Sequence, residues 1–353
     1  MGSGSALDRQ RIRKILIRST NWIGDAVMTT PAMGAVRAAF PRSELVVLAN
    51  PIVSELFSPH PYCDRVVIYD KKGIHHGAKG FLQLASELRR EHFDLAILFQ
   101  NAIEAAILAF LSGIPQRAGY RTDGRGFLLT HGIPVRQTGC ARHHTAYYVW
   151  MLNRLGISGG DGKLKLISSE GEKRWAREKL GDGRWIAINP GAAYGSAKRW
   201  IPERFAAVGD IVAKEFNARI LLTGGPAERE LGQDIESAMH TQPLNLIGKT
   251  SVREMMALLS RCALMVTNDS GPMHVAAAFS VPIVALFGPT DSTTTSPFSV
   301  NSRVVRKPVE CAPCLKRECP TDHRCMDSIE VGDVLEAVRS LLHTSKSENG
   351  TIS

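Results

Sequence analysis

Short apolar runs alternate with longer amphipathic segments along most of the chain. The runs predict buried strands at 14–18, 45–49, 66–69, 95–99, 185–189, 219–223, 244–247, 263–267 and 282–287. The segments between them have helical periodicity, at about 26–40, 79–91, 102–112, 143–155, 170–180, 203–216, 227–239, 251–260 and 272–279. This alternation is typical of a parallel sheet covered by helices on both faces.

A glycine-dense stretch at 156–162 interrupts the alternation, which then starts again. The pattern therefore predicts an α/β protein with two Rossmann-like, doubly wound domains facing each other across an interdomain cleft. We expect an N-terminal domain over 12–156, a linker over 157–168 and a C-terminal domain over 169–328. A helix over 329–343 and a disordered tail over 344–353 follow. Ligands of such sheets bind beyond the carboxyl ends of the strands.

Composition adds the cellular setting. The chain has 353 residues, of which 44% are hydrophobic and 22% are charged, as in a soluble globular protein. It contains no apolar run of ~18 residues and no signal-peptide pattern at its start, which predicts a cytoplasmic protein. The formal net charge of +9 favours anionic partners. Because the basic residues are scattered, we expect small anionic substrates or a membrane surface rather than nucleic acid.

The turn after the strand at 263–267 has the features of a phosphate site. It reads Asn268-Asp269-Ser270-Gly271-Pro272, and a helix follows with His274 on its first turns. Asp269 or Ser270 can cap that helix, and Pro272 suits its first turn. Free backbone amides at the positive end of a helix dipole attract phosphate. The alternatives are an ordinary capped turn and, for His274, a packed structural residue.

Three more strand-end turns combine small residues with a polar or charged group. The first runs from Asn189 to Trp200 and carries Lys198 and Arg199. The second ends in Glu228, and the third is Gly248-Lys249-Thr250. Each turn alone is compatible with a solvated loop, and Glu228 with a partner of a helix dipole. Together they predict a nucleotide-sugar pocket in the second domain.

The first strand-to-helix turn of the chain, Arg18 to Ala26, lacks the G-x-G-x-x-G fingerprint of dinucleotide-binding folds. It offers instead a single carboxylate, Asp25, next to a glycine. Asp25 is either an N-cap or a general base that takes a proton from a substrate hydroxyl. The residues themselves leave both readings open.

Four of the seven cysteines lie close together, with the spacing C-x2-C-x4-C-x5-C: Cys311, Cys314, Cys319 and Cys325. This group is compact enough to bind one zinc ion or an iron–sulfur cluster, with His323 as a substitute ligand. The spacing departs from the regular paired C-x2-C pattern, so free thiols or a disulfide formed after purification are the alternatives.

Three motifs in order resemble the bacterial lipopolysaccharide heptosyltransferases of glycosyltransferase family 9, most of all the type II enzymes. They are R-S-T-N-W-I-G-D-A-V-M-T-T-P-A near the start, N-P-G-A-A-Y-G-S-A-K-R-W in the middle, and N-D-S-G-P-M-H-V-A-A-A with F-G-P-T-D later. The resemblance spans Ile15 to Leu342. It implies a GT-B fold, with the N-terminal domain facing the lipid-linked acceptor and the C-terminal domain holding ADP-heptose.

The resemblance also implies an activity and a set of site residues. The activity is inverting transfer of L-glycero-D-manno-heptose to the first heptose of the inner core, at the cytoplasmic face of the inner membrane. No cofactor is required. Asp25 becomes the catalytic base, and Lys198 the diphosphate-binding lysine. The donor contacts are Glu228, Asp269, Ser270, Gly271 and His274, with Ala193, Tyr194, Gly248 and Thr250 at weaker matches.

The acceptor side is less specific. Basic residues gather late in the first half, where we expect contact with acceptor phosphates, Kdo carboxylates or anionic lipid: Arg117, Arg121, Arg125, Arg136, Arg142, His143 and His144. A solvated surface is the alternative. The sequence does not decide between the type II and type I acceptors, nor the oligomeric state. The competing classes are a sugar-nucleotide epimerase or hydrolase and a non-catalytic nucleotide-sugar-binding protein.

Overall fold

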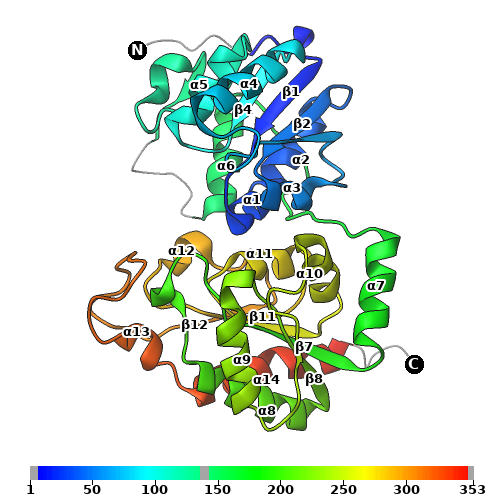
Figure 1. Ribbon diagram of the computed structural model, residues 1–353, viewed down its shortest axis with the longest axis vertical. Helices are drawn as coiled ribbons and strands as arrows, with labels where there is room; N and C mark the ends of the chain where they lie inside the picture. Colours follow the sequence, from blue (N-terminus) through cyan, green and yellow to red (C-terminus); the bar gives the residue numbers. More distant parts are fainter. Residues whose placement is uncertain (1–6, 136–142, 349–353) are drawn as a thin grey trace. The chain divides into compact units, whose positions relative to one another are not determined.

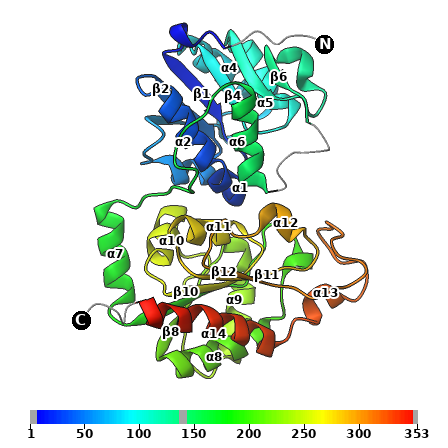
Figure 2. The same cartoon turned by 180° about the vertical axis from the view of Figure 1, so that it is seen from behind.

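The computed structural model describes residues 7–135 and 143–348, and the chain divides into two compact units, Met1–Ile167 and Ser168–Ser353. Each unit holds its own six-stranded sheet, in which every strand pair is parallel (Figures 1 and 2). The division falls in the stretch predicted as a linker. The two-domain α/β architecture is therefore confirmed.

The first sheet has the strand order β3-β2-β1-β4-β5-β6. Its strands are β1 (Lys14–Arg18), β2 (Glu44–Ala49), β3 (Arg65–Ile68), β4 (Leu95–Leu98), β5 (Gln116–Tyr120) and β6 (His131–Ile133). Its helices are α1 (Ile23–Met28), α2 (Thr30–Ala39), α3 (Pro51–Ser54), α4 (Gly77–Arg90), α5 (Ile103–Leu111) and α6 (His144–Arg154). The order reverses between β1 and β4, and at such a switch point the strand ends leave a crevice for ligands.

The second sheet has the order β12-β11-β10-β7-β8-β9. Its strands are β7 (Arg184–Asn189), β8 (Ala218–Leu222), β9 (Leu244–Asn245), β10 (Leu264–Asn268), β11 (Ile283–Leu286) and β12 (Ser302–Val305). Its helices are α7 (Glu170–Leu180), α8 (Pro202–Phe216), α9 (Arg229–Ala238), α10 (Val252–Leu259), α11 (Gly271–Ala278), α12 (Ser292–Thr295), α13 (Arg324–Asp327) and α14 (Val331–Glu348). Here the switch point lies between β7 and β10.

The central strands are buried at nearly every position, which is why they are mostly apolar. In the first unit, α4 and α5 cover the face that carries Leu16, Val46 and Leu98. In the second unit, α8, α9 and α14 cover the face that carries Ile188, Val266 and Leu286. Each core holds the strands of its sheet in position. The carboxyl ends of these strands in turn position the loops that follow them.

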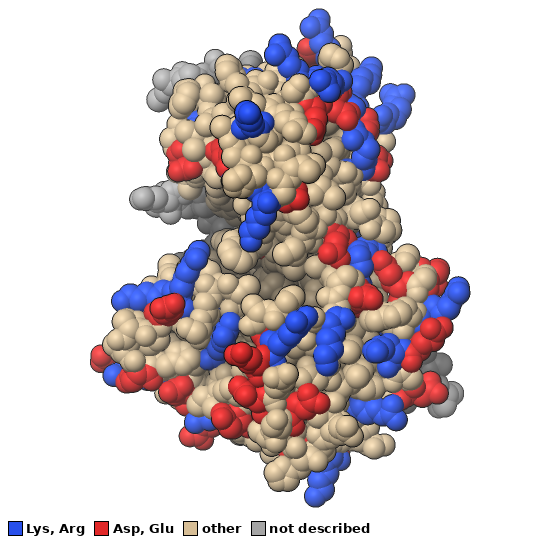
Figure 3. All heavy atoms as spheres, viewed as in Figure 1, with Lys and Arg blue, Asp and Glu red and all other residues tan. Residues whose placement is uncertain are grey.

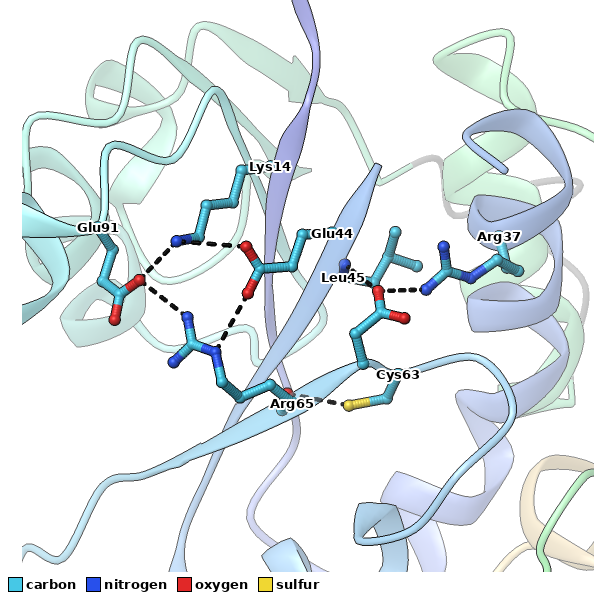
Figure 4. Close-up of polar contacts among 8 residues, drawn as sticks. Lys14, Arg37, Glu44, Leu45, Cys63, Arg65 and Glu91 are labelled. Atoms are coloured by element: carbon cyan, nitrogen blue, oxygen red, sulfur yellow. Dashed lines mark hydrogen bonds and ion pairs between the residues drawn. The ribbon is translucent and has the colours of Figure 1, made fainter. Parts of the chain in front are cut away.

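A closed ring of ion pairs links side chains at the opposite edge of the first sheet, where its strands begin (Figure 4). Lys14 binds Glu91 at 2.5 Å and Glu44 at 3.4 Å, and Arg65 binds the same two carboxylates at 2.8 and 3.1 Å. The hydrogen bond from Lys14 lowers the pKa of Glu91 below its ordinary value. These residues lie at the strand starts, so they stabilise the edge that carries no ligand loops.

Several element predictions were wrong in detail. The helix expected over 26–40 is two helices, because Pro31 has no amide to donate to the Val27 carbonyl, which accepts the Thr30 hydroxyl instead (2.7 Å). Strands β5, β6 and β12 were not predicted. The tail predicted to be disordered from 344 is helical as far as Glu348. The segment 157–167 belongs to the first unit, where His60 Nε2 lies 2.8 Å from the Lys165 carbonyl.

In the described part of the chain, no helix combines the length and the apolar character that crossing a bilayer requires.

Trp200 is the largest fully buried side chain, and we expect its removal to destabilise the second unit strongly. Its indole donates to the Ile329 carbonyl at 2.9 Å and packs edge-on against Phe205. Trp200→Ala should lower the free energy of unfolding by about 3–5 kcal/mol, because it leaves a cavity in the core and removes the indole hydrogen bond. Urea unfolding checks this, with Trp22→Ala, whose side chain is 48% exposed, as the control. Equal midpoints for the two variants would contradict it.

Candidate active site

The switch point of the second sheet brings together the turns after β7 and β10, as the sequence predicted for strand-end loops. Asn189 ends β7 and Asn268 ends β10, and each reaches across to the other turn. The Asn268 amide donates to the Pro190 carbonyl at 2.7 Å and accepts from the Trp200 amide at 3.2 Å. These buried hydrogen bonds fix the two turns to each other.

A buried ion pair joins the same two turns. Lys198 Nζ lies 2.6 Å from Asp269 Oδ2, and the two side chains are only 12% and 5% exposed. The Thr290 hydroxyl donates to the same carboxylate oxygen at 2.8 Å. The Lys198 ammonium also sits over the Tyr194 ring, 4.8 Å from its centroid. Lys198 is therefore held in one place, at the N-terminal side of α11.

Helix α11 begins at Gly271 with Pro272 in its first turn, as predicted. The predicted side-chain cap is absent, however, because Ser270 bonds elsewhere: its hydroxyl donates to Asn189 Oδ1 at 2.9 Å and contacts the Thr267 hydroxyl at 3.0 Å. Asp269 is likewise occupied by Lys198. With neither side chain capping the helix, its positive end keeps its attraction for an anion.

Glu228 is buried beside the β7 turn. It ends a short 3₁₀ helix, Pro226–Glu228, and its carboxylate accepts from the Gly225 amide at 2.7 Å. A Cβ on Gly191 would overlap this carboxylate, so the Glu228 side chain would have to shift to admit a larger residue there. Burial raises the pKa of Glu228 above its ordinary value, and the positive charge of Arg199 opposes that shift. A buried carboxylate beside the β7 turn is suited to accept hydroxyl hydrogen bonds from a ligand.

The remaining predicted donor residues have different surroundings. His274 is buried at 3% exposure in α11. Gly248 has φ +67° and donates its amide to the Gly224 carbonyl at 3.0 Å, which places the third turn beside the Glu228 turn. Thr250 is half-buried two residues on, whereas Ala193 is exposed next to Tyr194. The structure thus gathers the turns after β7, β8 and β10 and joins the 248–250 turn to them through Gly224.

In the first unit, Asp25 follows β1 at that sheet's switch point. The N-cap reading of Asp25 is wrong, because α1 begins at Ile23 with Trp22 as its N-cap residue. Asp25 lies in the first helical turn, with its side chain 29% exposed, and Oδ1 is 3.3 Å from His144 Nδ1. A partly exposed carboxylate at the end of a parallel strand is placed to meet a ligand.

Comparison with known proteins decides the family. The family model described as glycosyltransferase family 9 (heptosyltransferase) matches residues 81–324. Lipooligosaccharide heptosyltransferase 2 of Campylobacter jejuni is 31% identical over 339 residues, which cover 94% of this chain and 99% of the relative. The chain belongs to glycosyltransferase family 9. It is a glycosyltransferase, as the resemblance in its motifs implied.

Solved structures of family 9 proteins have the same fold as this family 9 chain. A family 9 glycosyltransferase from Veillonella parvula superposes with a TM-score of 0.85 at 26% identity, covering 96% of this chain and 99% of that one. E. coli ADP-heptose LPS heptosyltransferase II superposes with a TM-score of 0.79 at 27% identity, covering 94% and 99%. The GT-B fold expected from the sequence is confirmed.

A long loop of this glycosyltransferase, residues 311–325, packs on the β7 turn. The Tyr194 hydroxyl donates to the Leu315 carbonyl at 2.8 Å, and the Ala197 amide donates to the Arg317 carbonyl at 3.0 Å. Arg317 also lies over the Tyr194 ring, so this ring contacts two cations, Lys198 and Arg317. The loop therefore supports the segment that carries Tyr194 and Lys198.

The four clustered cysteines of this glycosyltransferase lie in that loop. Together with His323 they line a cavity of about 130 Å³. All four are free thiols, and the Thr321 hydroxyl lowers the pKa of Cys319 whereas burial raises that of Cys325 to about 11. Within 7–135 and 143–348, no three His, Cys, Asp or Glu side chains are arranged to hold a metal. His323 Nε2 instead lies 2.8 Å from the Ala197 carbonyl.

The predicted basic surface of the first unit holds only in part. Arg125 is completely buried, where it donates to the Tyr120 carbonyl at 2.8 Å, and burial lowers its pKa to about 10. It is a structural residue, so its assignment to the acceptor surface was wrong. Arg117 donates to the Leu128 carbonyl at 2.7 Å. Arg136, Arg142 and Cys140 lie outside the described residues.

In the second unit, basic and acidic side chains are interspersed on the face drawn in Figure 3.

Sequence reasoning missed three contacts. The Thr290 hydroxyl, in the F-G-P-T-D motif, donates to Asp269; the Ser270 hydroxyl donates to Asn189; and His144, expected only on a basic surface, contacts Asp25. Thr290 follows β11 and Asn189 ends β7, so the strand-end rule that found Lys198 could have indicated both. The contact of His144 with Asp25 carries no such signal.

We expect Glu228→Gln to stabilise the glycosyltransferase at neutral pH while weakening donor binding. Because burial raises the pKa of Glu228, the folded chain holds this proton more tightly than the unfolded chain does. Raising the pH above the unfolded-state pKa therefore costs folding free energy. Thermal unfolding from pH 4 to pH 8 checks this: the melting temperature of the variant should rise relative to that of the parent as the pH rises. A difference in melting temperature that does not change with pH would contradict the prediction.

Proposed function

We propose that this family 9 glycosyltransferase moves heptose from ADP-L-glycero-D-manno-heptose to the first heptose of the lipopolysaccharide inner core, with inversion at the anomeric carbon. The observation that carries the proposal is the set of contacts around Lys198, Asp269 and the uncapped start of α11. These groups suit a diphosphate. The names of the relatives, which include lipooligosaccharide heptosyltransferase 2 and ADP-heptose LPS heptosyltransferase II, support the choice of sugar and acceptor.

In the proposed reaction Asp25 is the general base. The acceptor hydroxyl oxygen attacks the anomeric carbon, its proton passes to the Asp25 carboxylate, and the bond from that carbon to the diphosphate oxygen breaks with its electron pair on ADP. Lys198, the amides of Ser270 and Gly271 and the α11 dipole stabilise the charge that develops on ADP. Glu228 accepts hydroxyl groups of the donor, and Tyr194, Ala193, His274, Gly248 and Thr250 line its site. These groups need no metal or other cofactor.

The acceptor is lipid-linked, so we place the enzyme at the cytoplasmic face of the inner membrane as a peripheral protein. Exposed basic side chains of the first unit, such as Arg121, favour an anionic lipid surface. Metal binding by Cys311, Cys314, Cys319 and Cys325 is a separate proposal, for zinc or an iron–sulfur cluster. Metal analysis of the purified chain tests it, and a metal-free chain with four titratable thiols there would contradict it.

The decisive experiment uses ADP-heptose and a panel of truncated acceptors. We incubate the enzyme with Kdo2-lipid A, with Hep-Kdo2-lipid A and with longer cores, and read the added mass by mass spectrometry. Addition of one heptose to Hep-Kdo2-lipid A alone supports the proposal. Addition only to Kdo2-lipid A would reassign the enzyme to the type I activity, and addition to none would refute the proposal.

A further inference from the structure

His144 meets the proposed catalytic carboxylate although 119 residues separate the two in sequence. His144 is the first residue of α6, and Asp25 lies in the first turn of α1. The contact joins His144 Nδ1 to Asp25 Oδ1 at 3.3 Å, with the side chains 41% and 29% exposed. Among the residues that the structure describes, His144 is the partner with which Asp25 forms an ion pair.

The start of α6 is held firmly, so the imidazole has a defined place. The side chain of the preceding residue, His143, accepts from the Thr145 amide and caps the helix. Farther along α6, the Tyr147 ring stacks on Tyr120 with centroids 4.1 Å apart, and the Tyr120 hydroxyl donates to the Tyr147 carbonyl at 2.6 Å. These contacts fix the backbone position from which the His144 side chain reaches Asp25.

Tyr148 closes the other side of this corner. Its ring is 5% exposed and packs edge-on against Phe99, which directly follows β4. Burial, reinforced by the negative charge of Asp25, raises the pKa of Tyr148, so the phenol stays neutral. It therefore brings no competing charge to Asp25. The carboxylate keeps one oxygen on His144 and has a second oxygen for another partner.

We propose that His144 is a positioning residue for the transfer reaction: its Nδ1 holds Oδ1 of Asp25, so that Oδ2 is presented to the acceptor hydroxyl. The inference rests on the proposed function and adds a role to it. During the step the hydroxyl proton moves to Asp25, while His144 neither gains nor loses a proton. A carboxylate held by one oxygen loses less orientational freedom on reaching the transition state, which lowers the barrier.

The test compares His144→Ala with His144→Asn, because the asparagine amide can replace the Nδ1 contact. His240→Asn is the control, because this histidine of the second unit has a side chain that is 92% exposed and lies outside the proposed site. We expect His144→Ala to lower kcat about 10- to 100-fold with KM for both substrates within about threefold, as expected for lost orientation. His144→Asn should recover kcat to within about fivefold of the parent, and His240→Asn should match the parent. Unfolding midpoints show that the variants are folded.

Three results would overturn the proposal. An unchanged kcat in His144→Ala makes the contact incidental. A loss confined to KM makes His144 a substrate ligand. A His144→Asn variant as inactive as Asp25→Asn makes the imidazole the proton acceptor.

A second readout keeps the test independent of the acceptor. In protein labelled with ¹⁵N-histidine, the ring signals missing from His144→Asn identify His144, and we expect them to shift in Asp25→Asn. Unshifted signals would refute the contact. If the parent enzyme transfers no heptose, the proposed function fails, whereas these signals still report on the contact.

Discussion

Asp25→Asn should lose about 1,000-fold in kcat while binding ADP as tightly as the parent enzyme. The substitution keeps the shape of the side chain and an oxygen for His144, but removes the group that accepts the acceptor proton. General-base catalysis contributes about 10²- to 10⁴-fold to a rate, so the loss should lie in the middle of that range. Initial rates with both substrates saturating measure kcat, and calorimetry measures ADP affinity.

The matched control for this variant is Asp8→Asn, which changes a carboxylate paired on the surface with Arg11. It should leave kcat unchanged, because its salt bridge is solvent-exposed and far along the chain from the β1 turn. Parent-like turnover in Asp25→Asn would remove Asp25 from the chemistry. Loss of ADP binding in the same variant would show instead that it disturbs the fold.

Lys198→Met should weaken ADP binding by roughly 30- to 100-fold and also destabilise the second unit. The affinity loss corresponds to about 2–3 kcal/mol for a charged contact to phosphate. The stability loss has a different cause, because the variant leaves Asp269 buried at 5% exposure without its cation. Breaking such a pair from one side costs up to about 3–5 kcal/mol. The Thr290 hydroxyl remains on Asp269 and should reduce that cost.

The double variant Lys198→Met, Asp269→Asn separates the two effects. Without the buried charge it should regain much of the unfolding free energy, yet ADP should still bind weakly. Lys214→Met, at an exposed lysine in the last turn of α8, controls for the loss of one positive charge. Unfolding curves and calorimetry on the same samples check both quantities. ADP affinity restored by the double variant would mean that Lys198 acts only as the partner of Asp269.

The central strands could be predicted because they are buried on both faces and read as unbroken apolar runs. Among the outer strands, β3 and β9 were predicted, whereas β5, β6 and β12 were not. Strand β6 has three residues, His131–Ile133, and β12 at the edge of the second sheet leaves Arg303 exposed, so neither presents such a run. Strand β5 contains Gln116 and Gly119, which lower its apolar character. Pairing with a neighbour formed these strands, and local sequence carries little record of that.

The candidate site could likewise be predicted only in part from the sequence. Lys198, Glu228 and Asp269 lie in the segments that follow β7, β8 and β10, and parallel strands bring their carboxyl ends to one edge. That rule predicted the gathering of their turns. It could not tell that Ser270 bonds Asn189 rather than capping α11, since both uses suit a serine. The contact of His144 with Asp25 depends on how α6 packs in the first unit, which no spacing in the sequence encodes.

Each half of the molecule closes its own sheet, and the backbone passes from one half to the other once, after Ile167. A recombination event at that single joint would exchange one intact body for another without cutting a core. Under the proposed function, such an exchange would bring a new acceptor-binding unit to an unchanged nucleotide-binding unit.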